Sequence, residues 1–252
     1  MSIRSAVLAL SPLLYWPLDE TSGITAGDVS GNGNVGDYYV GTLLGAPGPE
    51  TGTFAAASSG TQGGAQTRGN TPVTGMPVLT LSGWFSQAVA APSHSVIMYD
   101  GNSGTTGCGL DMDSSTPGTI RGGIGFDTSG FNTLLGRWHH LVFTEALAGV
   151  QQIYVDGSLK YTSIPFATNS VIAANPMLVQ FPPSASMAHF ACWSSVLAAA
   201  DVLAIYNGRV NPQESTASGR PLTDFDLAAI GADLAACCDV INLIYAAVHK
   251  LY

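Results

Sequence analysis

The segment Arg137-Trp-His-His-Leu-Val-Phe143 places two of the chain's five histidines side by side, in a run with the composition of a β-strand. Adjacent histidines first suggest a metal site or an acid/base pair. Successive side chains of a strand point to opposite faces, however, so His139 and His140 cannot bind one ion together. We expect one imidazole to face the core or the layer between two sheets, and the other to face a surface. The pair therefore predicts a structural strand of a β protein.

Short strands separated by turn residues continue on both sides of this segment. Asp156-Gly157, between Val155 and Ser158, is a two-residue hairpin signal that favours a type I′ turn. Many short strands with frequent turns predict an all-β fold of two antiparallel sheets, a sandwich or jelly roll. The expected strands are 13–18, 38–44, 53–57, 78–85, 94–99, 108–112, 120–126, 139–144, 151–155, 158–161, 177–181 and 187–193, with short helical segments at 5–10 and 198–206.

The composition excludes several classes of function. The 252 residues include 46% hydrophobic but only 10% charged residues, with a net charge of −9 and no cluster of Lys and Arg. A chain of this charge lacks the basic footprint that phosphate backbones require, so we expect no nucleic-acid partner. We find neither a secretory signal nor an apolar run of about 18 residues, and therefore expect no membrane span. The four cysteines form no CxxC pair and are expected to be reduced thiols.

The pattern changes near residue 210 and divides the chain into three expected parts. These are a jelly roll at 1–209, a Pro- and Ser-containing linker at 210–222, and an amphipathic helix at 223–252. The a and d positions of the helix form heptads that predict oligomerisation or anchoring, and isoleucines at both positions favour a homotrimer. The alternative is a helix that folds back on its own domain. The heptad residues are Leu227, Ile230, Leu234, Cys237, Ile241, Ile244, Val248 and Leu251.

Two groups of acidic and amide residues are candidates for chemistry. Asp111 and Asp113 share one face of a strand, as paired carboxylates of a glycoside hydrolase would, but no glutamate or third acid follows. Catalysis is therefore the least favoured reading, and we expect no enzyme. A Gly-rich loop offers oxygen ligands for Ca²⁺, and a turn without an ion is the slightly favoured alternative. The candidate calcium ligands are Asp28, Asn32, Asn34 and Asp37.

Five motifs in sequence order resemble the LamG-like family of concanavalin A-like jelly rolls, over about residues 5–209. They are Tyr15-Trp-Pro-Leu-Asp-Glu-Thr-Ser-Gly23; the turn with Asp28, Ser30, Gly31, Asn32, Gly33 and Gly36; the strand Leu79 to Trp84; Gly136, Trp138, His139, His140 and Thr144 followed by Tyr154 to Gly157; and Phe190, Trp193, Leu197, Ile205 and Tyr206. The resemblance implies two antiparallel sheets, a concave face, rim loops that bind glycans or proteins, often with Ca²⁺, and no catalysis. One departure is Met187-Ala188-His189, where the family carries acidic residues, and it weakens the expectation of calcium.

The chain also resembles minor tail and fibre proteins of tailed bacteriophages, in its opening segment, its Gly-, Ala- and Thr-rich composition and its appended helix. This resemblance implies a non-enzymatic virion component that is assembled in the host cytoplasm. Its expected partners are two further copies of itself or other virion proteins, and host-surface glycans. The alternative is a packing protein of the virion without a ligand. The candidate glycan-binding residues are Tyr38, Tyr39, Tyr99, Phe131 and Tyr161.

Overall fold

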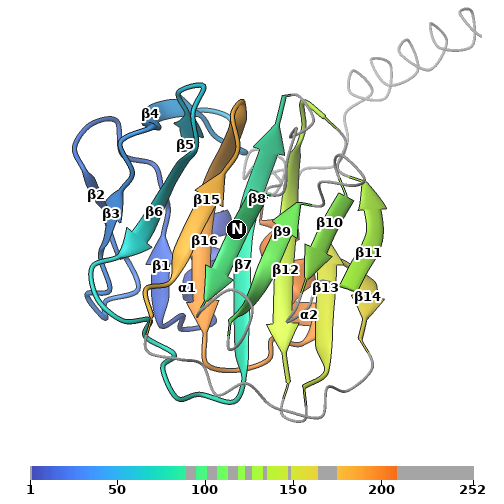
Figure 1. Ribbon diagram of the computed structural model, residues 1–252. Coiled ribbons are helices and arrows are strands. Elements are labelled where there is room, and N and C mark those ends of the chain that lie inside the picture. Colours follow the sequence, from blue (N-terminus) through green and yellow to red (C-terminus); the bar gives the residue numbers. More distant parts are fainter. Residues whose placement is uncertain are drawn as a thin grey trace, which may run out of the picture. The chain divides into compact units, whose positions relative to one another are not determined.

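In the part of the chain that it describes, the computed structural model shows two β-sheets that pack face to face, with two short helices on one side (Figure 1). The structure describes residues 2–88, 95–100, 107–112, 119–122, 127–132, 135–146, 149–163 and 175–208. All of them lie in one compact unit. The expected heptad helix at 223–252 and the linker before it lie outside the described residues.

Sheet A contains the segment RWHHLVF and is antiparallel throughout. Its strands in spatial order are β14 (Ser158–Thr162), β13 (Gln151–Val155), β12 (Trp138–Glu145), β7 (Leu79–Gln87), β16 (Ala185–Trp193), β5 (Phe54–Ser58) and β4 (Thr42–Pro47), and β1 (Leu14–Trp16) also pairs with β16. The β13–β14 connection is the expected Asp-Gly turn, because Asp156 and Gly157 both have positive φ, 51° and 75°.

Sheet B is also antiparallel and lies on the opposite side of the core. Its strands in spatial order are β11 (Asp127–Asn132), β10 (Thr119–Gly122), β9 (Cys108–Met112), β8 (Ser95–Asp100), β15 (Leu178–Phe181), β6 (Gly63–Thr67), β3 (Gly36–Tyr38) and β2 (Thr25–Ala26). The two-sheet antiparallel jelly roll expected from the sequence is confirmed.

The main core fills the layer between the sheets. Alternate residues of the central strands point into it, including Leu79, Leu81 and Phe85 of β7 and Val179 and Phe181 of β15, all nearly inaccessible to solvent. Burial of this apolar surface, at about 25 cal/mol per Å², is the main stabilising contribution to the sandwich.

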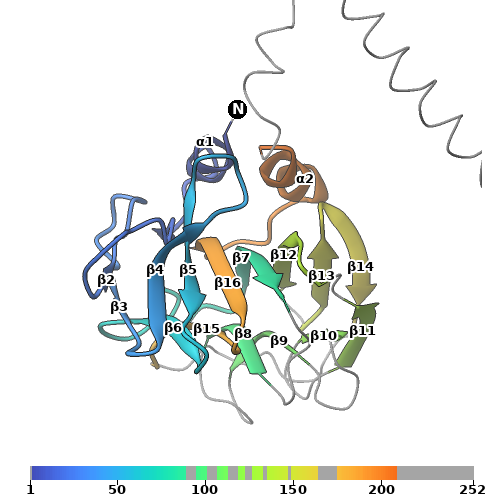
Figure 2. The same cartoon turned by 90° about the horizontal axis from the view of Figure 1, so that it is seen from above.

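A second core covers the outer face of sheet A. Helix α1 (Ile3–Leu8) and helix α2 (Ala199–Asn207) lie across this face, side by side (Figure 2). Trp84 of β7 is fully buried beneath them and stacks on Tyr206 of α2, with 5.9 Å between ring centroids. Sheet A is therefore shielded on both faces, whereas no described helix covers the outer face of sheet B (Figure 2).

The helices also correct one expectation about the histidines. His139 and His140 do point to opposite faces of β12, but both are buried, because α2 covers the face that we expected to be a surface. His140 lies 5.2 Å from the Trp84 ring and its Nε2 is hydrogen-bonded to the Ser82 hydroxyl at 2.9 Å. His139 Nδ1 lies 2.7 Å from Asp156 Oδ2. The two imidazoles lie on opposite faces of β12, as the alternation of the strand predicted, and their structural role stays a prediction.

Candidate ligand-binding face

A continuous row of side chains crosses the outer face of sheet B. Cross-strand partners in an antiparallel sheet project from the same face, so the strand register identifies the members of the row. We call Thr25, Asp37, Gln66, Leu178, Tyr99 and Gly109 the outer row; each is the direct partner of the next, on β2, β3, β6, β15, β8 and β9. The neighbouring set Ala65, Val179 and Met98 points inward and belongs to the core.

Tyr39 lies on this face beside the outer row. Its backbone N–H donates to the carbonyl of Gly64 at 2.9 Å, and its hydroxyl donates to Gln66 Oε1 at 3.3 Å. A Cβ at position 64 would lie 2.9 Å from the Tyr39 ring, so the glycine allows the ring to rest on the backbone of β6. Partial burial raises the pKa of the Tyr39 phenol, and a hydrogen bond with Gln180 opposes this rise. The result is an aromatic ring flanked by two amides.

Tyr99 provides a second aromatic group in the outer row. Its ring packs against Gly107, where a Cβ would come within 2.4 Å of the ring. Only 4% of Tyr99 is exposed, and burial raises the pKa of its phenol above the ordinary value of 10. Tyr99 therefore contributes a neutral, rigidly packed floor to the face, and Tyr39 is the more accessible of the two rings.

The arginines described on this face are both paired with aspartates. Arg121 Nε lies 3.2 Å from Asp111 Oδ1, and the Asp111 side chain is 0% exposed. Arg68 Nε lies 2.8 Å from Asp37 Oδ1, and its Nη2 donates to the Thr25 hydroxyl at 2.7 Å. The formal charges of the two ion pairs cancel, so their contribution to the face is electrically neutral.

The other expected ligand-binding residues lie elsewhere. Tyr38 faces the core side of β3, and its hydroxyl donates to Glu20 Oε2 at 2.5 Å. Tyr161 of β14 also packs against the core. Phe131 is part of β11, and its side chain lies outside the described residues. Of the five expected residues, the structure thus brings Tyr39 and Tyr99 to one face.

The candidate calcium loop is held by internal hydrogen bonds. The Asp28 carboxylate accepts backbone N–H groups of Tyr15, Ser30 and Asn34 at 3.0, 2.9 and 2.7 Å. The side-chain amides of Asn32 and Asn34 donate to the Leu13 carbonyl at 3.0 and 2.7 Å.

Asp37, the remaining candidate ligand of that loop, lies apart on the outer row with Arg68. Among the described residues, no three His, Cys, Asp or Glu side chains are grouped to hold a metal ion. The geometry is that of a hydrogen-bonded turn, and calcium binding stays a prediction.

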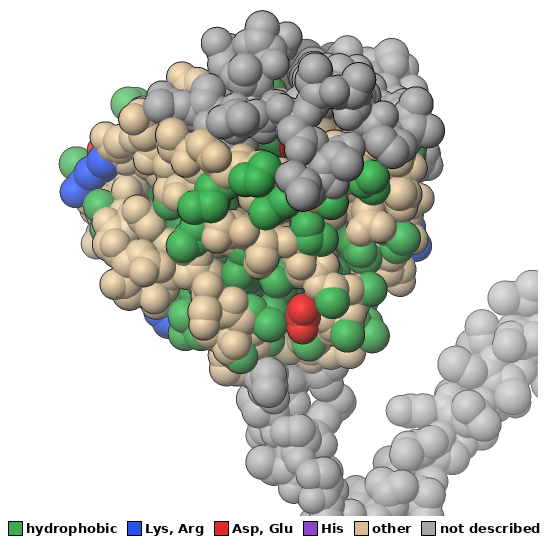
Figure 3. Space-filling model, turned by 90° about the horizontal axis from the view of Figure 1, so that it is seen from below, with side chains coloured by type: hydrophobic (Ala, Val, Ile, Leu, Met, Phe, Trp, Pro, Cys, Tyr) green, Lys and Arg blue, Asp and Glu red, His purple; other side chains and the backbone are tan. Residues whose placement is uncertain are grey.

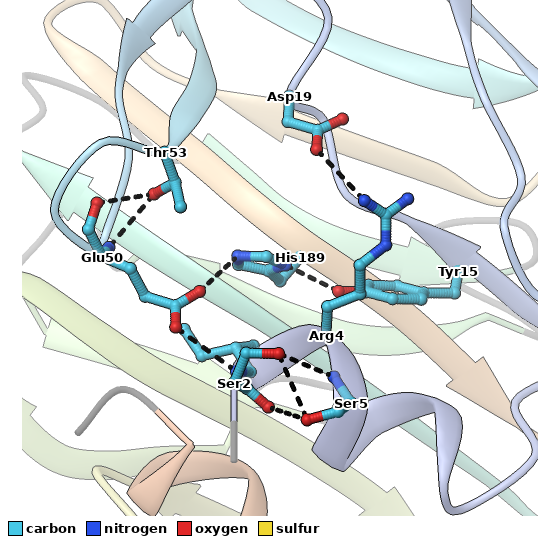
Figure 4. A network of polar contacts seen from close by, with 9 residues as sticks. Ser2, Arg4, Ser5, Tyr15, Asp19, Glu50, Thr53 and His189 are labelled. Atoms are coloured by element: carbon cyan, nitrogen blue, oxygen red, sulfur yellow. Dashed lines mark hydrogen bonds and ion pairs between the residues drawn. The ribbon is translucent and has the colours of Figure 1, made fainter. Parts of the chain in front are cut away.

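A polar network lies beneath helix α1 (Figure 4). The Tyr15 hydroxyl lies 2.7 Å from His189 Nδ1, and His189 Nε2 lies 3.7 Å from Glu50 Oε2. Burial raises the pKa of Tyr15 and lowers the pKa of His189 to about 4, so Tyr15 donates to a neutral imidazole. Glu50 Oε1 accepts the backbone N–H of Ile3 at 3.5 Å. Because Tyr15 and His189 are buried, we assign the network to the attachment of α1 to the sandwich.

Sequence reasoning missed strand β6, which carries Gln66, and also missed β2 and β11. The run Gly63-Gly-Ala-Gln-Thr67 resembles a turn, because glycine is rare in strands. Its alternation of small, inward residues with Gln66 was the available signal, and it is short and weak. Gln180 lies in the expected strand 177–181, but a single glutamine does not distinguish a binding face from a solvated one.

Two packed antiparallel sheets, with both described helices on the outer face of sheet A, define a jelly roll of the concanavalin A-like class. Residues 59–215 match the laminin-G-type family described as the concanavalin A-like lectin/glucanases superfamily, and the chain belongs to this family. The LamG-like resemblance seen in the sequence is thereby confirmed. A search of curated protein sequences gives no match.

Similar solved structures support the same fold. A structure of botulinum neurotoxin type C, whose cell entry is reported to depend on interaction with two ganglioside molecules, has a TM-score of 0.61 and 12% identity over 82% of this chain. Domain 4 of AbnA, a GH43 extracellular arabinanase from Geobacillus stearothermophilus in complex with arabinotriose, has a TM-score of 0.59 and 14% identity over 77% of this chain and 98% of its own. Trypanosoma rangeli sialidase has a TM-score of 0.55 and 14% identity over 77% of this chain. The chain spans 53% of the neurotoxin structure and 32% of the sialidase.

Proposed function

We propose that the outer face of sheet B is a glycan-binding face and that the protein is a non-enzymatic adhesion component. The main support for this proposal is the position of Tyr39. Its ring is partly exposed and flanked by the amides of Gln66 and Gln180, on the sheet face that the described helices leave uncovered. Membership of a family that includes lectins is consistent with this role. So is the arabinotriose bound by the similar AbnA domain.

The chemistry of these side chains suits a sugar. A pyranose presents C–H groups on its faces and hydroxyls at its rim. A tyrosine ring offers an apolar surface for the first, and an amide offers one acceptor and two donors for the second. Gly64 keeps the backbone beside Tyr39 free of a side chain. The pattern of one apolar platform with a few fixed polar groups is typical of small-ligand sites.

Catalysis has weak support at the expected carboxylates. Asp111 is buried and paired with Arg121 at 3.2 Å, which holds it as a structural ion rather than as an acid or base facing a substrate. Asp113 lies outside the described residues. The family name covers both lectins and glucanases, and the absence of enzymatic activity is therefore part of the proposal.

The proposed setting is a bacteriophage virion, in a tail, a fibre or a surface decoration. Its support is the low content of charged residues, and the heptad pattern of 223–252 supports a homotrimer or docking on another virion protein. Three weak sugar sites on one particle gain avidity without strong single-site affinity. The structure contains no described helix long and apolar enough to span a membrane.

A glycan array probed with the full-length protein tests this proposal. We expect binding that Tyr39→Ala and Gln66→Ala each weaken by about tenfold or more, as loss of a central aromatic or hydrogen-bonding contact does. The matched control is Leu159→Ala, which removes a 48% exposed side chain from the edge of sheet A. Binding that is unaffected by both face variants would refute the assignment.

A packing role in the virion without a ligand is the second candidate function. Leu8, Leu159 and Leu203 are 38%, 48% and 45% exposed, and they lie on α1, β14 and α2. On the face shown in Figure 3, hydrophobic and uncharged polar side chains also predominate. Such surfaces suit contacts with neighbouring subunits. A blank glycan array together with stable assembly into particles would favour this function.

A further inference from the structure

The cations of the sandwich are few, and their positions bear on which sugars the face accepts. Residues 1–208 contain five Lys and Arg against twelve Asp and Glu. Arg4 is on helix α1, 3.7 Å from Asp19, and therefore on the side away from sheet B. Arg137 immediately precedes β12, and Lys160 lies on β14, both in sheet A. Among the residues that the structure describes, Arg68 and Arg121 are the cations that remain for the outer face of sheet B.

We infer that this face takes uncharged glycans and disfavours sialylated or otherwise anionic ones. The inference rests on the proposed function and specifies its ligand class. An anionic sugar would need a cationic partner, and an arginine fork is the usual one. Arg121 and Arg68 already hold Asp111 and Asp37, so an incoming carboxylate would have to displace one of these partners.

Displacing Asp111 from Arg121 would cost much free energy, and displacing Asp37 from Arg68 would gain the ligand little. The Asp111 side chain is 0% exposed, and breaking a buried pair leaves its carboxylate without compensation. The side chains of Arg68 and Asp37 are nearly half exposed, and an exposed ion pair in water contributes little binding free energy. The excess of acidic residues on the sandwich also repels an approaching anion at long range.

The remaining polar groups favour hydroxyls. Gln66, Gln180 and the Tyr39 hydroxyl are neutral, and each can both donate and accept a hydrogen bond. Hydroxyl groups of a neutral sugar satisfy both capacities, whereas a carboxylate accepts only. The face therefore selects by hydrogen-bond character as well as by charge.

The test compares one oligosaccharide with and without a terminal sialic acid. Dissociation constants for the full-length protein are measured by calorimetry at low and high salt. We expect the dissociation constant of the sialylated form to be at least about tenfold higher. Part of this difference should persist at high salt, because salt screens only the long-range repulsion.

Three variants locate the origin of the preference. Asp37→Asn removes the carboxylate paired with Arg68, and Asp111→Asn removes the one paired with Arg121. Each should narrow the ratio of the two dissociation constants severalfold. Asp19→Asn releases Arg4 on the helix side, changes the net charge equally, and should narrow the ratio less. If Asp111→Asn does not fold, Asp37→Asn carries the test, because its ion pair is exposed.

The outcomes separate the two proposals. Equal or tighter binding of the sialylated form overturns the inference and leaves glycan binding standing. A ratio that Asp19→Asn narrows as much as the face variants overturns the role of the two ion pairs. Binding of neither oligosaccharide, with a blank glycan array, overturns the proposed function and the inference with it.

Discussion

Acidification below about pH 6.5 should destabilise the sandwich through His140 and His189. Both imidazoles are buried, His140 beside the stacked rings of Trp84 and Tyr206, and His189 in the network beneath α1. Burial lowers the pKa of His140 to about 3 and the pKa of His189 to about 4, against an ordinary value of 6.5. Both are therefore neutral in the folded protein at pH 5, and both are protonated in the unfolded chain.

The direction and the size of the change in unfolding free energy follow from this difference in protonation. Between pH 6.5 and the folded pKa, the unfolded state binds one more proton per histidine, so stability falls as the pH falls, by about 1.4 kcal/mol per pH unit and group. The two together remove about 5 kcal/mol between pH 6.5 and 4.5, a large part of the roughly 5–15 kcal/mol that stabilises a domain. Glu50 acts in the opposite direction, because burial raises its folded pKa, and Asp156 adds to the loss at lower pH because its pKa is lowered.

Urea unfolding, followed by tryptophan fluorescence at pH 7, 6, 5 and 4.5, measures how steeply the free energy of unfolding changes with pH. The variant His189→Asn should halve this slope, because it removes one of the two titrating imidazoles. Asparagine also tolerates the left-handed backbone at φ 54°. Tyr15→Phe removes the hydroxyl beside His189 but retains both imidazoles, so it should lower stability without reducing the slope. A free energy of unfolding that is constant from pH 6.5 to 5, or a slope unchanged in His189→Asn, would show that the buried imidazoles do not control acid stability.

Further predictions concern the Asp156-Gly157 turn, the heptad segment at 223–252 and the candidate calcium loop at Asp28. Asp156→Ala removes the acceptor for His139 Nδ1 and for the His140 N–H, 2.7 and 3.0 Å away, and places alanine at φ 51°; we expect a loss of about 2–4 kcal/mol in chemical denaturation, and a smaller loss in Asp156→Asn. Ile230→Asp and Ile241→Asp should reduce the mass in light scattering from trimer to monomer, whereas Ala232→Asp, outside the a and d positions, should not; a wild-type monomer at high concentration would contradict the heptad interpretation. If the loop at Asp28 binds calcium, millimolar Ca²⁺ should raise the melting temperature of the wild type but not of Asp28→Asn, and equal melting with calcium and with chelator would remove that prediction.

Most of the strands were predictable because their side chains alternate. Strands β9 and β13 have the expected bounds, and the Asp-Gly turn forms as predicted, since each depends on local sequence alone. The burial of His140 was not predictable, because it depends on α2, about sixty residues later in the chain.

The candidate site was only partly predictable. Tyr39 was identified as an aromatic residue, but its amide neighbours Gln66 and Gln180 come from strands distant in sequence. Strand β6 was obscured by its glycines, of which Gly64 is needed where the Tyr39 ring approaches the backbone and Gly63 where the Phe181 ring does. The register between β6, β15 and β8 defines the outer row, and no single strand contains that information.

The two ends of the described chain meet on one side of the sandwich. Gly208, after α2, packs against Ile3 of α1, where an added Cβ would lie 3.0 Å from the Ile3 backbone, and both helices lie on the side away from sheet B (Figure 2). A tether joined at either end of the described chain therefore begins on the helix side of the sandwich, opposite the proposed glycan-binding face. Immobilisation of the protein on a sensor through its N-terminus, next to α1, should consequently leave that face free for ligand, so that surface-based affinity measurements agree with those in solution.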